Sequence, residues 1–88
     1  MHRLERWHYA GVPVFGTVLI SPKALRSLRD DEVSDQELLD ALEFGSGIRA
    51  RTDHTLIGRE HNGVRLVIRT HPHLAGSAAV CINGYRVK

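Results

Sequence analysis

The chain has 88 residues, of which 42% are hydrophobic, and this length supports one small domain around one hydrophobic core. Its single cysteine, Cys81, excludes an intramolecular disulfide framework, and no apolar run approaches the roughly 20 residues that span a bilayer. Charge is divided unevenly, because residues 1–45 carry five Lys/Arg and eight Asp/Glu whereas residues 46–88 carry seven and two. We expect a cytoplasmic protein without membrane contact, whose basic half suits a polyanion such as a nucleic acid.

Residues 1–20 are predicted to form an extra strand or a hairpin before the rest of the domain. The segment Trp7–Ile20 is rich in aromatic and β-branched residues, and Gly11 and Pro13 interrupt it, which indicates one bent strand or a loose hairpin. Its aromatic side chains either belong to the core or anchor a protein interface, and these are Trp7, Tyr9 and Phe15.

Residues 21–45 are predicted to form a pair of short helices. Ser21 followed by Pro22 is a typical helix start, since a serine hydroxyl accepts from a free backbone N–H and proline lacks that donor. The second helix is expected to begin after Ser34, with Glu37 completing a capping box, and to end at Gly45. Part of the acidic charge is therefore ordinary helix-capping chemistry.

Residues 46–88 are predicted to form an antiparallel sheet. The sequence alternates between apolar and polar residues after Gly45, and Asn62-Gly63 is a strong signal for a two-residue hairpin turn. The following strand, Val64–Thr70, places Arg65 and Arg69 on a face opposite its aliphatic side chains. Asn83-Gly84 indicates either a second hairpin turn or a glycine bulge in the last strand.

The alternation predicts a basic surface that binds nucleic acid. Arg65 and Arg69 stand roughly 13 Å apart on one strand, a spacing that suits successive phosphates of a polymer. If consecutive strands pair, other cations extend this surface. The predicted nucleic-acid-binding residues are Arg49, Arg51, Arg59, Arg65, Arg69, Arg86 and Lys88.

Histidines in the basic half are candidates for acid–base chemistry near neutral pH. Metal-independent RNA cleavage needs a base, an acid and cations for the developing charge, and the predicted catalytic set is His61, His71, Arg65, Arg69 and Tyr85. The alternative is that these histidines only occupy loops and turns. His71 and His73 have a spacing seen in metal sites, but the pattern lacks further ligands, so we expect neither metal nor cofactor.

The order of a capped helix pair and then basic antiparallel strands resembles small RelE-like and BrnT-like bacterial toxins. The segments Ile20–Gly45 and Gly58–Ile68 resemble an uncharacterised toxin-like family, and the likeness covers about residues 20–88. This resemblance implies a RelE-type ribonuclease fold with activity resting on sheet residues, which correspond here to Arg59, Arg65, Arg69 and Tyr85. The family commonly has a histidine entering its first helix, where this chain has Ser21-Pro22-Lys23, so catalytic competence stays open.

Together these patterns predict an α+β fold in which two short helices pack on one face of a four- to five-stranded, mainly antiparallel sheet. The leading hypothesis is a bacterial or phage toxin-like protein that binds RNA and, if it is an enzyme, acts as an endoribonuclease whose protein partner is an antitoxin. The alternative is a non-enzymatic interaction module, either a phage-encoded inhibitor or a homodimer, that uses the Trp7–Ile20 segment as an edge strand.

Overall fold

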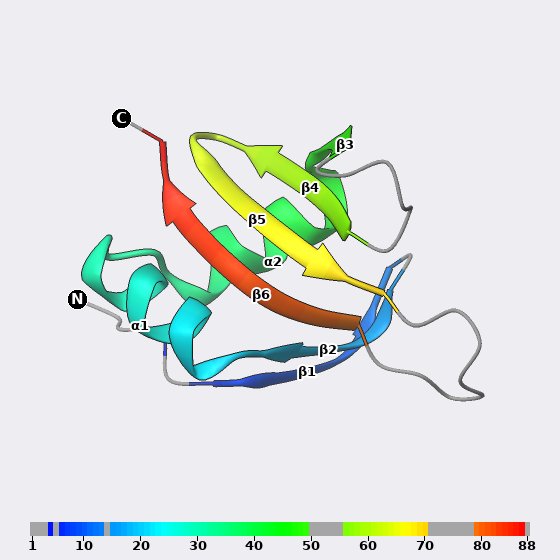
Figure 1. Ribbon diagram of the computed structural model, residues 1–88, viewed down its shortest axis with the longest axis horizontal. Helices are drawn as coiled ribbons and strands as arrows, with labels where there is room; N and C mark the ends of the chain where they lie inside the picture. The colour runs from blue at the N-terminus through cyan, green and yellow to red at the C-terminus, as the bar shows by residue number, and fades with distance from the viewer. Residues whose placement is uncertain (1–3, 5, 14, 50–55, 71–78, 88) are drawn as a thin grey trace.

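The computed structural model describes residues 4, 6–13, 15–49, 56–70 and 79–87, which form two helices and one sheet (Figure 1). The elements in chain order are β1 (His8–Val12), β2 (Gly16–Ile20), α1 (Pro22–Asp30), α2 (Asp35–Phe44), β3 (Ser46–Arg49), β4 (Leu56–His61), β5 (Val64–Arg69) and β6 (Ala79–Arg86). The predicted α+β class and the hairpin before the first helix are confirmed.

The sheet is larger and more mixed than the sequence indicated. Its six described strands follow the order β1-β2-β6-β5-β4-β3, so the N-terminal hairpin belongs to the same sheet. β2 pairs with β6 in parallel, while the other neighbouring strands are antiparallel. The prediction of four to five strands was wrong because the hairpin does not stand apart: β2 hydrogen-bonds to β6 and removes what would otherwise be an open edge.

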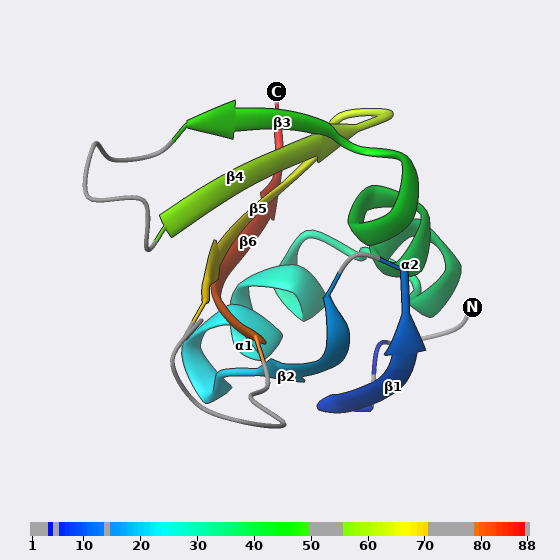
Figure 2. The ribbon, with the colours of Figure 1, turned by 90° about the vertical axis from the view of Figure 1, so that its right-hand side faces the viewer.

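Both helices lie on the same side of the sheet, and we call that side the inner face and the opposite side the outer face (Figure 2). α1 packs on β6, and α2 packs against β4, β5 and β1. Strand alternation sends Val64, Leu66 and Ile68 of β5 inward, where all three are buried. No helix of the described residues covers the outer face, and none is long and apolar enough to cross a membrane.

The helix starts form as their sequences predict. The Ser21 hydroxyl accepts a hydrogen bond from the Ala24 N–H at 3.1 Å, and Pro22 occupies the first turn of α1. At α2, Ser34 and Glu37 form the complete capping box, in which each side chain accepts from the other residue's backbone N–H at 3.1 Å. These contacts satisfy donors that a helix start otherwise leaves without partners.

The hairpin between β4 and β5 is also confirmed. Asn62 and Gly63 both have positive φ, 49° and 80°, as a two-residue turn of the type favoured by Asn-Gly requires. In β6 the pairing with β5 shifts between Cys81 and Asn83, which leaves Ile82 as an extra residue. The last strand continues to Arg86 rather than turning back, so the prediction of a hairpin turn at Asn83-Gly84 was wrong. A bulge is present as the other alternative proposed, but it lies at Ile82 and not at the glycine.

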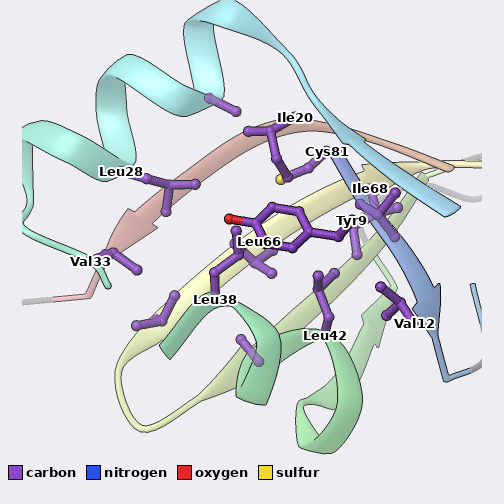
Figure 3. Packing of buried hydrophobic residues seen from close by; sticks show 14 of the residues in the cluster. Tyr9, Val12, Ile20, Leu28, Val33, Leu38, Leu42, Leu66, Ile68 and Cys81 are labelled. Carbon is purple, nitrogen blue, oxygen red and sulfur yellow. The ribbon is translucent and has the colours of Figure 1, made fainter. Parts of the chain in front are cut away.

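A single cluster of apolar side chains fills the space between the helices and the inner face, with the Tyr9 ring near its centre (Figure 3). The Tyr9 hydroxyl donates a hydrogen bond to Asp35 Oδ1 at 2.5 Å, and burial together with this carboxylate raises the pKa of Tyr9. Cys81 is also fully buried, and burial raises the pKa of its thiol to about 12. As the sequence indicated, this cysteine is a small core residue rather than a nucleophile.

Gly45 ends α2, but it does so in an extended conformation (φ −62°, ψ 143°) rather than in the left-handed one. Close packing is what requires glycine here. A Cβ at this position would lie 2.3 Å from the Ala41 carbonyl oxygen and 3.2 Å from Arg59 Cβ. The turn from α2 into β3 therefore brings backbone from two elements too close for any side chain.

We predict that Gly45→Ala lowers the free energy of unfolding by about 2 kcal/mol or more, because the added methyl group must push apart α2 and β4. Gly47→Ala is the matched control, since a Cβ there meets nothing within 4 Å. Its effect should lie between zero and about 1 kcal/mol of stabilisation. Urea unfolding monitored by circular dichroism measures both values, and equal effects of the two substitutions would contradict this account of Gly45.

Candidate nucleic-acid interface

The outer face of β4, β5 and β6 carries a row of polar side chains that crosses all three strands. Glu60 of β4 pairs directly with Arg65 of β5, and Arg65 pairs with Tyr85 of β6. Directly paired residues of antiparallel strands project from the same face, so the register alone brings these three side chains together. We call Glu60, Arg65 and Tyr85 the polar row.

Arg65 is the centre of the polar row and contacts both neighbours. Its Nε donates to Glu60 Oε1 at 2.9 Å, and its Nη2 lies 2.7 Å from the same oxygen. On the other side, Nη1 donates to the Tyr85 hydroxyl at 3.3 Å, and both contacts raise the pKa of Arg65. These contacts hold the guanidinium in place. The Arg65 side chain is nevertheless 40% exposed, so it also contacts solvent.

Arg69 lies further along β5 on the same outer face, between Leu56 of β4 and Val80 of β6. It is exposed, and its neighbours in the register are aliphatic rather than acidic. No ion pair joins it to another described residue. Between Arg69 and the polar row, Val67 pairs with Gly58 on one side and with Asn83 on the other. The structure thus unites three predicted residues, Arg65, Arg69 and Tyr85, on one face.

Arg86 lies on the inner side of the sheet and binds the helix pair instead. Its guanidinium forms a bidentate ion pair with Glu37, at 2.9 Å and 3.1 Å. It also donates to the carbonyl oxygens of Asp31 and Glu32, and its backbone N–H donates to Asp31 Oδ2 at 2.8 Å. We call this set of contacts the Arg86 clasp. It fastens the end of β6 to the loop between the helices, so the predicted phosphate contact is already occupied by acidic partners.

Arg59 also projects from the inner face, because it pairs with Leu66 rather than with Arg65. Its Nη1 donates to the Gly45 carbonyl oxygen at 2.8 Å, and its guanidinium carbon lies 5.2 Å from the centre of the Phe15 ring. A cation at the C-terminal end of α2 interacts favourably with the partial negative charge there. Arg59 therefore has a structural partner on the side opposite the outer face.

His61 is separated from the arginines of the outer face. It pairs with Val64, an inward-facing core residue, and its ring centre lies 6.1 Å from that of Phe44 at the end of α2. Arg49 closes β3, where only its backbone is described, and its register partner is Ile57. Three predicted residues lie outside the described residues, namely Arg51, His71 and Lys88.

The three aromatic residues proposed as interface anchors occupy different environments. Trp7 is 60% exposed beside the edge strand β1, whereas Tyr9 is 1% exposed in the core. Phe15 is partly buried, packs against the core and contacts Arg59. Only Trp7 is therefore placed where a partner can reach most of its ring.

Glu60 is the residue of this face that the sequence analysis did not select. The Asn62-Gly63 turn predicts this position. In a hairpin with a two-residue loop, the residue before the loop pairs with the residue after it, and each step back along the first strand pairs with one step forward along the second. Counting outward from the turn gives the observed pairs His61 with Val64 and Glu60 with Arg65. The same count places Arg59 opposite Leu66, on the inner face.

Within the described part of the chain, no three histidine, cysteine or acidic side chains gather closely enough to hold a metal ion. One hollow of about 380 Å³ lies against α1, lined by Pro22, Leu25, Arg26, Arg29 and Asp30. None of these residues belongs to the sheet. This hollow therefore lies away from the outer face.

Comparison with known proteins adds no assignment. No protein-family model matches the chain, and no curated protein or solved structure is found to match it either. The likeness to RelE-like and BrnT-like toxins remains a prediction from the sequence.

The Arg86 clasp predicts acid-sensitive stability. The Arg86 guanidinium and the Ser34 N–H lower the pKa of Glu37 from 4.5 to about 2. A depressed folded-state pKa stabilises the fold above the unfolded value and loses that stabilisation as the pH falls from about 4.5 towards 2. Glu37→Gln keeps an acceptor for the capping box but removes the charge. We expect it to lower the free energy of unfolding near neutral pH and to converge with wild type near pH 2.

Urea unfolding at a series of pH values measures this difference. Asp40→Asn is the matched control, because Asp40 lies on the same helix and accepts a hydrogen bond from Gln36 rather than from an arginine. A constant difference between wild type and Glu37→Gln from neutral pH down to pH 2 would rule out the ion pair as its source.

Proposed function

We propose that the chain binds single-stranded RNA on the outer face of β4, β5 and β6. The observation that carries this proposal is the placement of Arg65, Arg69 and Tyr85 on one face that no described helix covers. Arginine supplies charge and donors for phosphate, and an aromatic ring supplies a surface on which a base can stack. An open sheet with both is a recurrent platform for unpaired nucleotides.

Arg69 is the cation of this face best suited to a phosphate. Arg65 shares its charge with Glu60, whereas Arg69 is exposed between two aliphatic neighbours. The strand rise separates the two residues by roughly 13 Å, which leaves room for more than one nucleotide between them.

Our proposal covers binding and not cleavage. RNA cleavage needs a proton acceptor next to the cations that stabilise the transition state. His61 projects from the inner face beside Phe44, on the opposite side of the sheet from Arg65 and Arg69. Of the two histidines predicted to be catalytic, His61 is thus on the other side of the sheet and His71 lies outside the described residues, so cleavage is not part of the proposal.

The test is binding of a labelled single-stranded RNA at several salt concentrations, followed by fluorescence anisotropy. Arg69→Ala should weaken binding and reduce the magnitude of the slope of log K against log salt by about 0.7, the value for one phosphate contact on a single strand. Arg26→Ala is the matched control, since Arg26 is an exposed arginine of α1 on the helix side of the sheet.

Arg26→Ala should leave the slope unchanged. Equal effects of the two substitutions would show a nonspecific response to net charge, and binding that does not depend on salt would refute the proposal. A single-stranded DNA of the same sequence should bind more weakly if the 2′-hydroxyl contributes.

A second candidate function is self-association through the edge strand β1. β1 ends the strand order, so no described strand pairs with its outer side, and Trp7 beside it is 60% exposed. A second copy pairing edge to edge would supply the missing hydrogen bonds and cover this ring. The pairing would be short, because Gly11 has a φ of 68° and the register of β1 shifts between Tyr9 and Val12.

Sedimentation equilibrium tests this candidate. We expect a concentration-dependent dimer that Trp7→Ala weakens at least tenfold, the size expected for an aromatic anchor that is buried on binding. Phe44→Ala is the matched control, because Phe44 is equally exposed, at 60%, and belongs to α2. Trp7 is the only tryptophan, so its emission should also shift to the blue as the dimer forms. A monomer at every concentration would exclude the candidate.

A further inference from the structure

The polar row holds Arg65 in a way that leaves part of its hydrogen-bonding capacity directed at solvent. A guanidinium has five N–H donors. Glu60 Oε1 accepts from Nε and the Tyr85 hydroxyl accepts from Nη1, while Nη2 lies 2.7 Å from Glu60 Oε1 as part of the ion pair. Each terminal nitrogen therefore keeps at least one N–H without a hydrogen-bond partner among the described residues. A pair of N–H groups on the two terminal nitrogens is the fork that a guanidinium offers to two adjacent acceptor atoms.

The ion pair with Glu60 changes which ligand this fork prefers. Because the Arg65 charge is balanced by a carboxylate 2.7 Å away, a phosphate approaching Arg65 also meets the negative charge of Glu60. A neutral ligand with two acceptors meets no such repulsion. The Tyr85 ring next to the guanidinium, with 6.0 Å between the ring centre and the guanidinium carbon, adds a surface for a flat group.

We propose that the polar row is a base-reading site that selects bases with two adjacent acceptors. Guanine offers O6 and N7, and cytosine offers N3 and O2. In adenine, N7 and N1 each lie beside the N6 amino group, and in uracil, O2 and O4 each lie beside N3–H. One N–H of the Arg65 fork would therefore face a donor instead of an acceptor. This inference rests on the proposed RNA binding: Arg69 contributes affinity through phosphate, Arg65 contributes selection through the base, and Glu60 is a positioning residue.

The experiment compares labelled single-stranded RNAs of equal length: adenosine only, uridine only, alternating adenosine and guanosine, and alternating adenosine and cytidine. We expect the strands with guanosine or cytidine to bind roughly five- to a hundredfold more tightly than the other two, the range for one forked contact. The two mixed strands show which of the two bases is preferred. Replacing guanosine by 7-deazaguanosine removes N7 and should abolish most of the preference for guanosine.

Three variants separate selection from affinity. Arg65→Lys keeps the charge but loses the fork, so it should equalise the four strands while retaining RNA binding. Arg69→Ala is the matched control and should weaken all four strands alike with the preference intact. Glu60→Gln removes the ion pair that orients Arg65 and should reduce the preference. All three residues are partly or fully exposed, so the variants should fold, and circular dichroism checks this.

The outcomes distinguish this inference from the proposal on which it rests. Equal binding of all four strands by the wild type would overturn base reading and leave RNA binding standing. A preference that survives Arg65→Lys or 7-deazaguanosine would overturn the forked contact. If Glu60→Gln tightened binding to every strand without changing the preference, Arg65 would be a phosphate ligand instead. Absence of binding to any strand would overturn both proposals.

Discussion

The placement of both helices on one face of the sheet decides the environment of every strand residue. A chain of this length can bury only one core, and here the core lies between the helices and the inner face. Period-two alternation then divides each strand between that core and the outer face. In β5 this division puts Leu66 inside and Arg65 outside. The same rule separates Arg59 from Arg65, although the two arginines lie on neighbouring strands of one hairpin.

This division also explains much of the segregation of charge along the sequence. The acidic and basic halves meet in the Arg86 clasp, where Glu37, Asp31 and Glu32 from the helix pair bind an arginine of the last strand. Arg59 is engaged as well, at the C-terminal end of α2. Two arginines of the basic half, Arg59 and Arg86, therefore stabilise the contact between the helices and the sheet. Because these charges already have partners inside the protein, the net positive charge of residues 46–88 overstates the number of cations available to a polyanion. What remains of interest is the position of individual arginines.

Local signals in the sequence predicted local structure well, because caps and tight turns depend on residues a few positions apart. Ser21, Ser34 with Glu37, and Asn62-Gly63 all behave as their chemistry requires. The parallel pairing of β2 with β6 could not be read in this way, since it joins segments about 60 residues apart and depends on how the whole sheet closes. The face of Arg86 was also hidden, because the extra residue Ile82 changes the alternation within β6. By contrast, the pairing of Glu60 with Arg65 is a local property, because the Asn62-Gly63 turn fixes the register of the strands on either side of it.

The Glu60 carboxylate has two opposite effects on the outer face: it lowers the attraction for phosphate, and it fixes the orientation of Arg65. On electrostatic grounds alone, an acidic residue 2.7 Å from Arg65 lowers the attraction of this face for phosphate. It also fixes a long side chain that would otherwise lose rotamer entropy on binding, and preorganisation of that kind favours a ligand that matches the fixed geometry. A purely electrostatic RNA-binding face would gain from an uncharged residue at position 60. The glutamate at position 60 therefore supports the proposal that Arg65 selects a base through the direction of its hydrogen bonds and that Arg69 binds phosphate through its charge.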